Sequence, residues 1–411
     1  MNSKVIVSQL GARMHYAVPR ILHAQGRLER LYTDICGSKG WPRMFGAIPP
    51  SIRPQALRRL VGRVPQGVPS ERITTFPRFG IECAIRRASA KTLTERTAVE
   101  IWSGQVFSEL VARSGFGGAR AVFGYSGECL GLLKAARAAG LRTVVEQTNA
   151  PRGIVSEFFD QEQERFPDWE NRVGVDDSIA QYNAMEAAEW NAADVVLCGS
   201  TFVRQSIARQ GGPVDRCIVV PYGVGPRFNL APKKRREGPL RVLTIGEVGL
   251  RKGSPYVMQA ARLTKGIAEF RMVGLCSISP KIQAALSSVV DLRGAVPRSD
   301  ILEHYQWADV FLLPSICEGS ATVVYEALAA SLPVITTPNT GTVVRHGVDG
   351  YVVPIRDADA IAQAIQVLAR DEELRLSMAV NAASQARNYD LENYGRRLSD
   401  AFSFEASYAA V

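Results

Sequence analysis

The stretch Asp309-Val-Phe-Leu-Leu-Pro314, followed by Glu318-Gly-Ser-Ala-Thr-Val-Val-Tyr-Glu326, decides the fold. It begins as an apolar strand, continues through a glycine-bearing loop and enters an apolar helix. This order predicts a strand-loop-helix unit of a parallel sheet in an α/β protein. Phosphorylated ligands often bind where such a loop meets its helix, so the two carboxylates that flank the loop mark a candidate site.

Glu326 lies among apolar residues on nearly every side of its predicted helix. A carboxylate in such surroundings needs a polar partner. Ribose or sugar hydroxyls would provide one, and so would an arginine or a backbone amide of the protein itself. The sequence leaves these alternatives open.

The rest of the chain repeats the alternation of strand and helix patterns. With 411 residues, of which 46% are hydrophobic and 22% charged, the chain is long enough for two globular domains. Apolar runs predict parallel strands at 5–10, 121–125, 142–146, 195–199 and 217–221 in the first half, and at 240–246, 269–273, 289–293, 310–314, 334–337 and 351–353 in the second.

A charged stretch bounded by prolines, residues 231–239, predicts a linker between the halves. We therefore expect a first domain over 1–230 and a second over 240–390. Residues 391–411 begin with apolar side chains on one helical face, so this last helix must pack on another element.

Other sequence features exclude several classes of protein. The seven cysteines are scattered and form no C-x-x-C pair, so neither a disulfide framework nor a zinc site is expected. The N-terminal apolar run is too short for the core of a signal peptide, and no run approaches the length of a membrane span. We expect a cytoplasmic protein, or one that is peripheral to the inner face of a membrane.

The net charge of +9 is concentrated in one segment. Residues 38–96 contain twelve lysines and arginines and three acids, and a helical pattern near residue 57 is amphipathic. Such a basic, partly aromatic segment is suited to anionic lipid headgroups. Alternatively, the acidic residues of 156–190 neutralise it within one domain. No recognition motif accompanies the charge, so nucleic acid is not an expected partner.

Three features of the second half converge on a diphosphate. A buried strand leads into Gly246-Glu-Val-Gly-Leu-Arg-Lys-Gly253, where glycine permits close approach and Arg251 and Lys252 supply charge. The helix start at 319–322, with Ser320 or Thr322 as the expected cap, offers free amides to an anion. Glu318 lies at the same edge and is suited to sugar hydroxyls or to a developing positive charge. Taken singly, the first two features also fit an ordinary solvated helix start.

From about residue 189 to 354, the chain resembles the retaining glycosyltransferases of family 4, the group 1 enzymes with the GT-B fold. The resemblance rests on the sequence blocks at 193–200, 219–224, 251–253, 307–315, 318–334 and 346–353. It implies two Rossmann-like domains with parallel sheets facing a cleft, and a C-terminal helix that crosses back to the first domain. It also implies a nucleotide-diphosphate sugar as donor, with no cofactor and no metal required.

The resemblance further implies a role for each matching residue. Arg251 and Lys252 would grip the donor diphosphate, Glu326 would take the ribose hydroxyls, and Glu318 would act beside the transferred sugar. The remaining donor-binding residues would be Gly246, Gly294, Ala295, Val296, Gly319, Ser320, Ala321 and Thr322.

On the acceptor side, Gly11, Arg13 and His15 follow the first strand and resemble the family's glycine loop. A structural role for His15 is an equal alternative. Glu146 or Gln147 stands where the family has a histidine, so the resemblance does not fix the acceptor-side roles. Two donor-side blocks also depart from the family: Gly246 is followed by Glu247 rather than arginine, and the block at 340–344 lacks its glutamate.

Asp357 and Asp359 superficially match an Asp-x-Asp metal signature, but the apolar helix that follows predicts helix capping. His304 and His346 lack a second ligand at metal spacing. The chain is therefore expected to be a retaining glycosyltransferase that acts on a glycan, lipid-linked or small-molecule acceptor in the synthesis of cell-surface polysaccharide or glycoconjugate. A nucleotide-sugar epimerase or hydrolase of the same fold, or a binding protein without activity, is the alternative.

Overall fold

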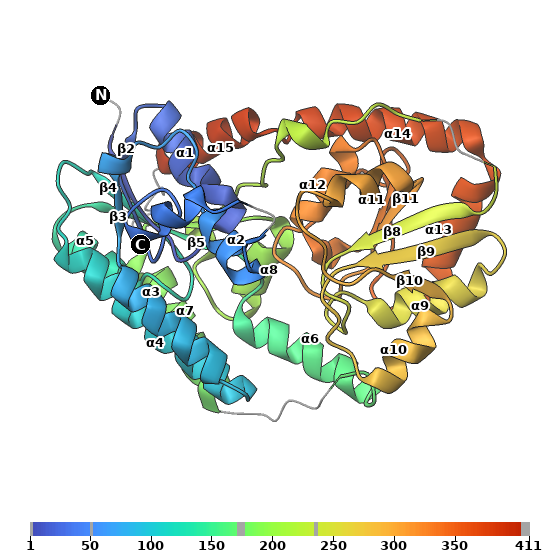
Figure 1. The fold of residues 1–411 in the computed structure, drawn as a ribbon, viewed down its shortest axis with the longest axis horizontal. Helices are drawn as coiled ribbons and strands as arrows, with labels where there is room; N and C mark the ends of the chain where they lie inside the picture. The colour runs from blue at the N-terminus through green and yellow to red at the C-terminus, as the bar shows by residue number, and fades with distance from the viewer. Residues whose placement is uncertain (1–2, 50–51, 171–176, 234–236, 404–411) are drawn as a thin grey trace.

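The computed structural model describes residues 3–49, 52–170, 177–233 and 237–403. Two parallel sheets lie side by side along the long axis of the molecule, each covered by helices (Figure 1). The expected fold class is confirmed. Parts of two predicted segments, residues 234–236 of the linker and 404–411 of the last helix, lie outside the described residues.

The first sheet has seven parallel strands in the order β3-β2-β1-β4-β5-β6-β7. Their bounds are β1 Val5–Ser8, β2 Leu28–Thr33, β3 Ile73–Thr75, β4 Ala121–Tyr125, β5 Arg142–Gln147, β6 Val195–Cys198 and β7 Cys217–Val219. The helices of this part are α1 Ala17–Ala24, α2 Gln55–Val61, α3 Pro77–Ser89, α4 Leu93–Arg113, α5 Leu130–Ala138, α6 Arg152–Arg165, α7 Asp177–Ala192 and α8 Thr201–Arg209.

The second sheet has six parallel strands in the order β10-β9-β8-β11-β12-β13. They are β8 Leu240–Ile245, β9 Ala268–Val273, β10 Val290–Leu292, β11 Val310–Leu313, β12 Val334–Thr336 and β13 Gly350–Val352. The helices are α9 Ser254–Leu263, α10 Pro280–Ser287, α11 Ile301–Trp307, α12 Thr322–Ala329, α13 Ala358–Arg370, α14 Glu372–Arg387 and α15 Leu391–Ser403.

The strands form where the sequence is apolar because both faces of each sheet are covered. All four residues of β1, β6 and β11 are buried. Since every strand is parallel, the loops at their carboxyl ends gather along one edge of each sheet, and the two edges meet between the domains.

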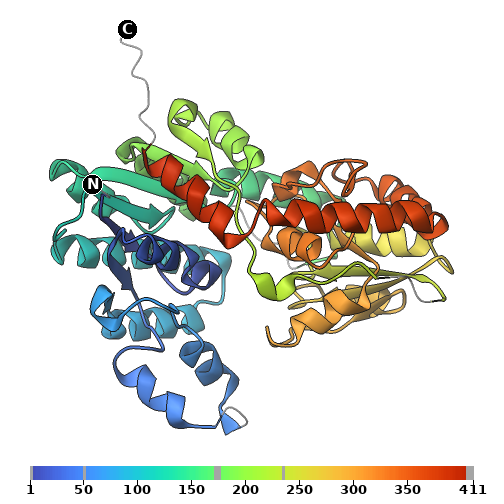
Figure 2. The ribbon, with the colours of Figure 1, turned by 90° about the horizontal axis from the view of Figure 1, so that it is seen from above.

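The helix α15 returns from the second domain to the first, as the resemblance implied. Figure 2 shows α14 along the second domain and α15 over the first. The side chain of Gln25, next to α1, donates to the carbonyl of Gly395 over 3.3 Å and accepts from the Ser399 hydroxyl over 2.8 Å. The ring of Phe402 lies 6.0 Å from that of Phe123 in β4.

The segment 152–170 departs from the expected domain division. Its helix α6 begins at the first domain and runs to the second (Figure 1). Trp169 is buried in the core cluster of the second domain, and the carbonyl of Trp169 accepts a hydrogen bond of 2.8 Å from Ser279 before α10. The expected first domain, 1–230, includes residues near 170, but these residues pack on the second domain.

Among the described residues, no helix has the length and apolar character needed to cross a membrane.

Candidate active site between the domains

The predicted cationic pair meets Glu318. The loop after β8 carries Arg251 and Lys252, and both side chains form ion pairs with Glu318 Oε1, at 2.8 and 2.6 Å. Burial raises the pKa of Glu318, but Lys252 and Arg251 outweigh it and bring that pKa below its usual value. Glu318 is therefore ionised at neutral pH, and the cluster of three side chains keeps a net positive charge.

The loop that begins α12 lies beside this cluster, since it directly follows Glu318. The amides of Glu318 and Ala321 donate to the carbonyls of Asn339 and Thr340, at 2.9 and 3.0 Å. Among the residues that the structure describes, the amides of Gly319, Ser320 and Thr322 donate no hydrogen bond. Two elements that carry predicted anion-binding groups are thus brought together at one edge.

The expected cap of α12 is wrong. The N-cap is Ala321, and no side chain caps the helix. The Ser320 hydroxyl instead shares a hydrogen bond of 2.7 Å with the Tyr325 hydroxyl, and Thr322 is the exposed first residue of the helix. The Ser320 hydroxyl therefore bonds to Tyr325 instead of capping the helix, although serine is a favoured N-cap residue.

Glu326 has partners within the protein. The Arg298 guanidinium donates to it over 3.1 Å and the Tyr305 hydroxyl over 2.9 Å. Burial raises the pKa of Glu326, while Arg298 and Tyr305 lower it in part. Arg298 follows Gly294, Ala295 and Val296 in the loop after β10, so this loop and α12 form one wall.

The glycine loop of the first domain faces the same region. The Gly11 amide donates to Asp34 over 3.1 Å, and Gly11 has a positive φ of 70°. Arg13 donates to the Thr148 hydroxyl over 3.3 Å and lies 4.0 Å from Glu128. Burial lowers the pKa of His15, and Arg298 and Arg227 lower it further, so His15 is neutral at pH 7 and lies near the Glu326 wall.

Glu146 and Gln147 end β5, where the resemblance placed a histidine. Glu146 accepts a hydrogen bond of 2.7 Å from the Tyr222 hydroxyl, and burial raises its pKa to about 7. Gln147 donates to Glu186 over 2.8 Å and accepts from the Trp190 indole over 2.9 Å. The Gln147 side chain is therefore held in place on both sides by the first domain.

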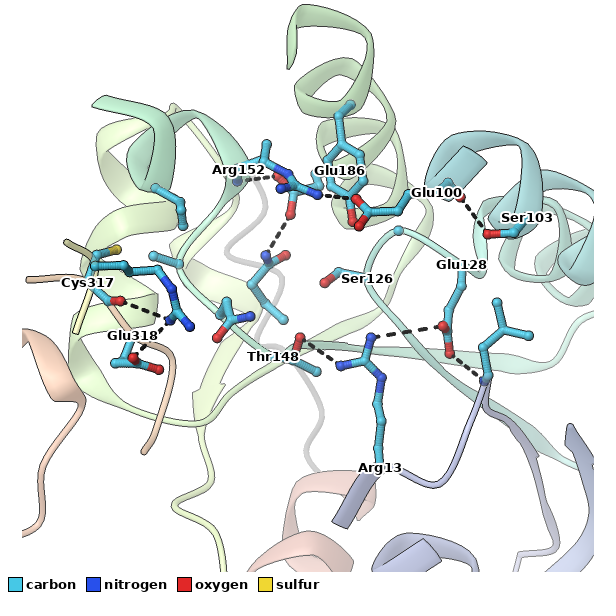
Figure 3. Close-up of a pocket in the computed structure, with 18 of the residues that line it drawn as sticks. Arg13, Glu100, Ser103, Ser126, Glu128, Thr148, Arg152, Glu186, Cys317 and Glu318 are labelled. Atoms are coloured by element: carbon cyan, nitrogen blue, oxygen red, sulfur yellow. Dashed lines mark hydrogen bonds and ion pairs between the residues drawn. The ribbon is translucent and has the colours of Figure 1, made fainter. Parts of the chain in front are cut away.

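A cavity of about 570 Å³ opens between the domains (Figure 3). Of the predicted site residues, its lining includes Arg13, Gln147, Arg251 and Glu318. Lys252 lines a smaller adjoining cavity of about 120 Å³. Neither lining includes Gly11, His15, Glu146, Gly246, Gly294, Ala295, Val296, Gly319, Ser320, Ala321, Thr322 or Glu326.

The cavity also has polar residues that the sequence did not single out. In Figure 3, Ser126, Glu128, Arg152 and Glu186 surround its first-domain side. The Leu10 amide donates to Glu128 over 3.0 Å, and burial raises the Glu128 pKa to about 7. One signal could have revealed this group: Ser126 and Glu128 directly follow a predicted strand, at the same sheet edge as the other loops.

Within the described ranges, no group of three His, Cys, Asp or Glu side chains could hold a metal ion. Asp357 caps α13 by accepting from the Ala360 amide over 2.7 Å, as expected. All seven cysteines are free thiols.

The sequence of the second domain is similar to that of known proteins. Residues 239–371 match the family model described as glycosyl transferases group 1. The amylovoran biosynthesis glycosyltransferase AmsK of Erwinia amylovora is 28% identical over 44% of this chain and 48% of its own length. A Campylobacter jejuni N,N'-diacetylbacillosaminyl-diphospho-undecaprenol alpha-1,3-N-acetylgalactosaminyltransferase is 34% identical over 36% of this chain and 40% of its own. The alignments thus span about half the length of these curated relatives or less.

Solved structures show the same fold over nearly the whole chain. HepE of Anabaena, in complex with UDP, has a TM-score of 0.61 at 15% identity and covers 98% of this chain and 99% of its own. Sucrose-phosphate synthase of Thermosynechococcus elongatus has a TM-score of 0.63 at 16% identity and covers 98% of both. Residues 239–371 of the second domain are therefore similar to the group 1 glycosyl transferases, and the chain as a whole has the GT-B fold.

Proposed function

We propose that this chain transfers a sugar, with retention, from a nucleotide-diphosphate donor to a glycan, lipid-linked or small-molecule acceptor in the synthesis of a cell-surface polysaccharide or glycoconjugate. The observation that supports this most is the convergence of Arg251, Lys252 and Glu318 with the free amides at the start of α12. The amylovoran relative is named for polysaccharide synthesis and the Campylobacter relative for an undecaprenol-linked sugar.

The arrangement supports bond breaking at the anomeric carbon. As the bond between sugar and diphosphate breaks, negative charge grows on the leaving oxygen, where Arg251 and Lys252 can stabilise it. The amides of Gly319 and Ser320 add a positive field at the N-terminus of α12. These groups belong to the folded protein before the donor binds, so little reorganisation is needed when the charge develops.

Glu318 fits a positioning role better than a nucleophilic one. Both Arg251 and Lys252 bind the same carboxylate oxygen, which fixes the orientation of the side chain. In this proposal the acceptor hydroxyl attacks from the side of the departing diphosphate and gives its proton to the leaving phosphate oxygen as the bond between sugar and diphosphate breaks. Glu318 orients the sugar and the two cations. The Glu326, Arg298 and Tyr305 cluster would then hold the ribose of the donor.

The test is donor-dependent transfer by Lys252→Ala and Glu326→Ala, after thermal stabilisation has identified a nucleotide sugar that binds the wild type. Each substitution should lower turnover. Lys252→Ala should lower it by about 100-fold or more, as expected for the loss of a group that stabilises the leaving charge. Exposed residues of the same types, Lys265→Ala and Glu303→Ala, serve as controls. Wild-type turnover in both site variants would refute the proposed site.

We further propose that the basic segment 38–96 contacts an anionic membrane surface. Arg63 pairs with Asp34 and Arg72 with Glu29, so two acids outside the segment neutralise part of its charge. A third ion pair, between Arg86 and Glu82, lies within the segment. Figure 2 shows the part near α2 projecting away from the first sheet. Met44 and Ile52 are 77% and 69% exposed there, which supplies apolar contact beside the cations.

Cosedimentation with vesicles tests this contact. Binding should rise as anionic lipid replaces neutral lipid, and Met44→Ser/Ile52→Ser should weaken it. Sedimentation that is independent of anionic lipid content would count against the membrane proposal and leave the transferase proposal intact.

A further inference from the structure

The segment 152–170, which we call the α6 arm, connects the two walls of the site. At its start, Arg152 lines the cavity and forms an ion pair with Glu100 of the first domain. At its end, Asp168 accepts through its carbonyl a hydrogen bond of 2.8 Å from the Ser279 hydroxyl, at the beginning of α10. The arm therefore leaves the first domain and ends on the second.

In the far half of the arm, the side chains of Glu162 and Trp169 are buried against the second domain. Glu162 has no exposed surface and is bound by Arg356 at 2.6 Å and by the Tyr256 hydroxyl at 2.8 Å. Trp169 is 3% exposed and shares a buried cluster with Leu250. The burial of these two side chains indicates a fixed contact, because a charged side chain is almost never fully buried unless it is paired.

The last residue of the arm holds the backbone of the cationic loop. Glu170 accepts a hydrogen bond from the amide of Leu250, the residue directly before Arg251. A Cβ at Gly249 would lie 2.6 Å from a Glu170 carboxylate oxygen, so glycine leaves room for the carboxylate in this position. On the other side of the loop, the Gly249 amide donates to the Ser254 hydroxyl over 2.8 Å.

We infer that Glu170 is a positioning residue for the diphosphate site: it fixes the loop 247–253 so that Arg251 and Lys252 converge on Glu318. The inference rests on the proposed function for the identity of the ligand. Its physical basis is that a short loop held through the Gly249 and Leu250 amides presents its two cations in one orientation, which lowers the entropy lost when an anion binds.

The experiment compares Glu170→Ala, Glu170→Gln and Glu164→Ala. Alanine removes the acceptor for the Leu250 amide, whereas glutamine keeps a carbonyl oxygen there. Glu164 is exposed on the same arm and serves as the matched control. Calorimetric titration measures binding of UDP and UMP, with GDP and GMP as the second pair, because only the diphosphates extend to the cationic loop.

Glu170→Ala should weaken binding of the diphosphate by about ten-fold, which corresponds to ~1.4 kcal/mol, and leave the monophosphate nearly unchanged. Glu170→Gln and Glu164→Ala should bind both ligands like the wild type. The inference is overturned if Glu170→Ala binds the diphosphate normally, or if it loses both ligands equally, as a general loosening of the fold would cause. Absence of nucleotide binding by the wild type would instead contradict the proposed function.

Discussion

Glu318 and Glu326 are both buried and eight residues apart, yet their pKa values shift in opposite directions. Burial raises the pKa of both, but Lys252 and Arg251 outweigh burial at Glu318, whereas Arg298 and Tyr305 offset it only in part at Glu326. The sequence predicted both carboxylates because their positions follow from a strand-loop-helix pattern. It could not predict that Arg298 and Tyr305 bind Glu326, since these residues come from elements whose placement only the tertiary fold decides.

Glu146 gives a prediction at the residue scale. Burial raises its pKa to about 7, well above the usual value near 4.5. The folded protein therefore holds a proton here that the unfolded chain releases, and stability falls as pH rises from about 4.5 to about 7. A shift of this size corresponds to roughly 3 kcal/mol at most.

Glu146→Gln removes this dependence of stability on pH, and the side-chain carbonyl still accepts the hydrogen bond from the Tyr222 hydroxyl. Urea unfolding should show the variant to be more stable than the wild type at pH 8 and similar to it near pH 4.5. The exposed Glu303→Gln should leave the pH profile unchanged. A variant that is less stable than the wild type at pH 8 would show that the buried charge has a stabilising partner.

At the scale of elements, the sequence predicted the strands whose residues are apolar and missed two that are not. The strand β2 reads Leu-Glu-Arg-Leu-Tyr-Thr. Its two charged residues are only partly buried, and they interrupt the apolar run by which the other strands were predicted. The strand β3 has three residues and lies inside the basic segment. The α6 arm was missed because its sequence is acidic, while its burial depends on a partner domain far along the chain.

The arm provides a prediction about the ion pair between Arg356 and Glu162. Glu162 is buried and is bound by Arg356 and by the Tyr256 hydroxyl. Arg356→Ala removes the charged one of these two partners, so the free energy of unfolding should fall by about 3 kcal/mol. Chemical denaturation measures this loss. Arg370→Ala, at an exposed site at the end of α13, is the control and should have little effect. An equal loss of unfolding free energy in both variants would show that the buried ion pair contributes no more to stability than the exposed arginine does.

At the scale of the whole molecule, the two domains touch at the loop that precedes α12. The Ser200 hydroxyl of the first domain donates to the carbonyl of Gly319. A Cβ at Gly319 would lie 1.9 Å from the Thr148 carbonyl oxygen. The sequence predicted two parallel-sheet domains and the return of α15, but it could not predict this contact, because close backbone approach leaves no periodic pattern.

Gly319→Ala should therefore force the domains apart. We expect a larger radius of gyration in solution scattering, a loss of about 1 to 3 kcal/mol in stability, and reduced transfer. Gly225→Ala is the control, since no atom lies within 4 Å of its added Cβ. An unchanged radius of gyration together with normal transfer would show that the contact yields locally.

The α6 arm has a consequence for how the protein is made. Trp169 leaves the ribosome before the sheet that buries it exists, since β8 to β13 follow later in the chain. At ordinary rates of translation, roughly 10 to 40 s pass before these on the order of 200 residues have been synthesised. Throughout that interval the aromatic end of the arm lacks the sheet that buries it in the folded protein, and slower elongation after residue 170 would lengthen the exposure of Trp169.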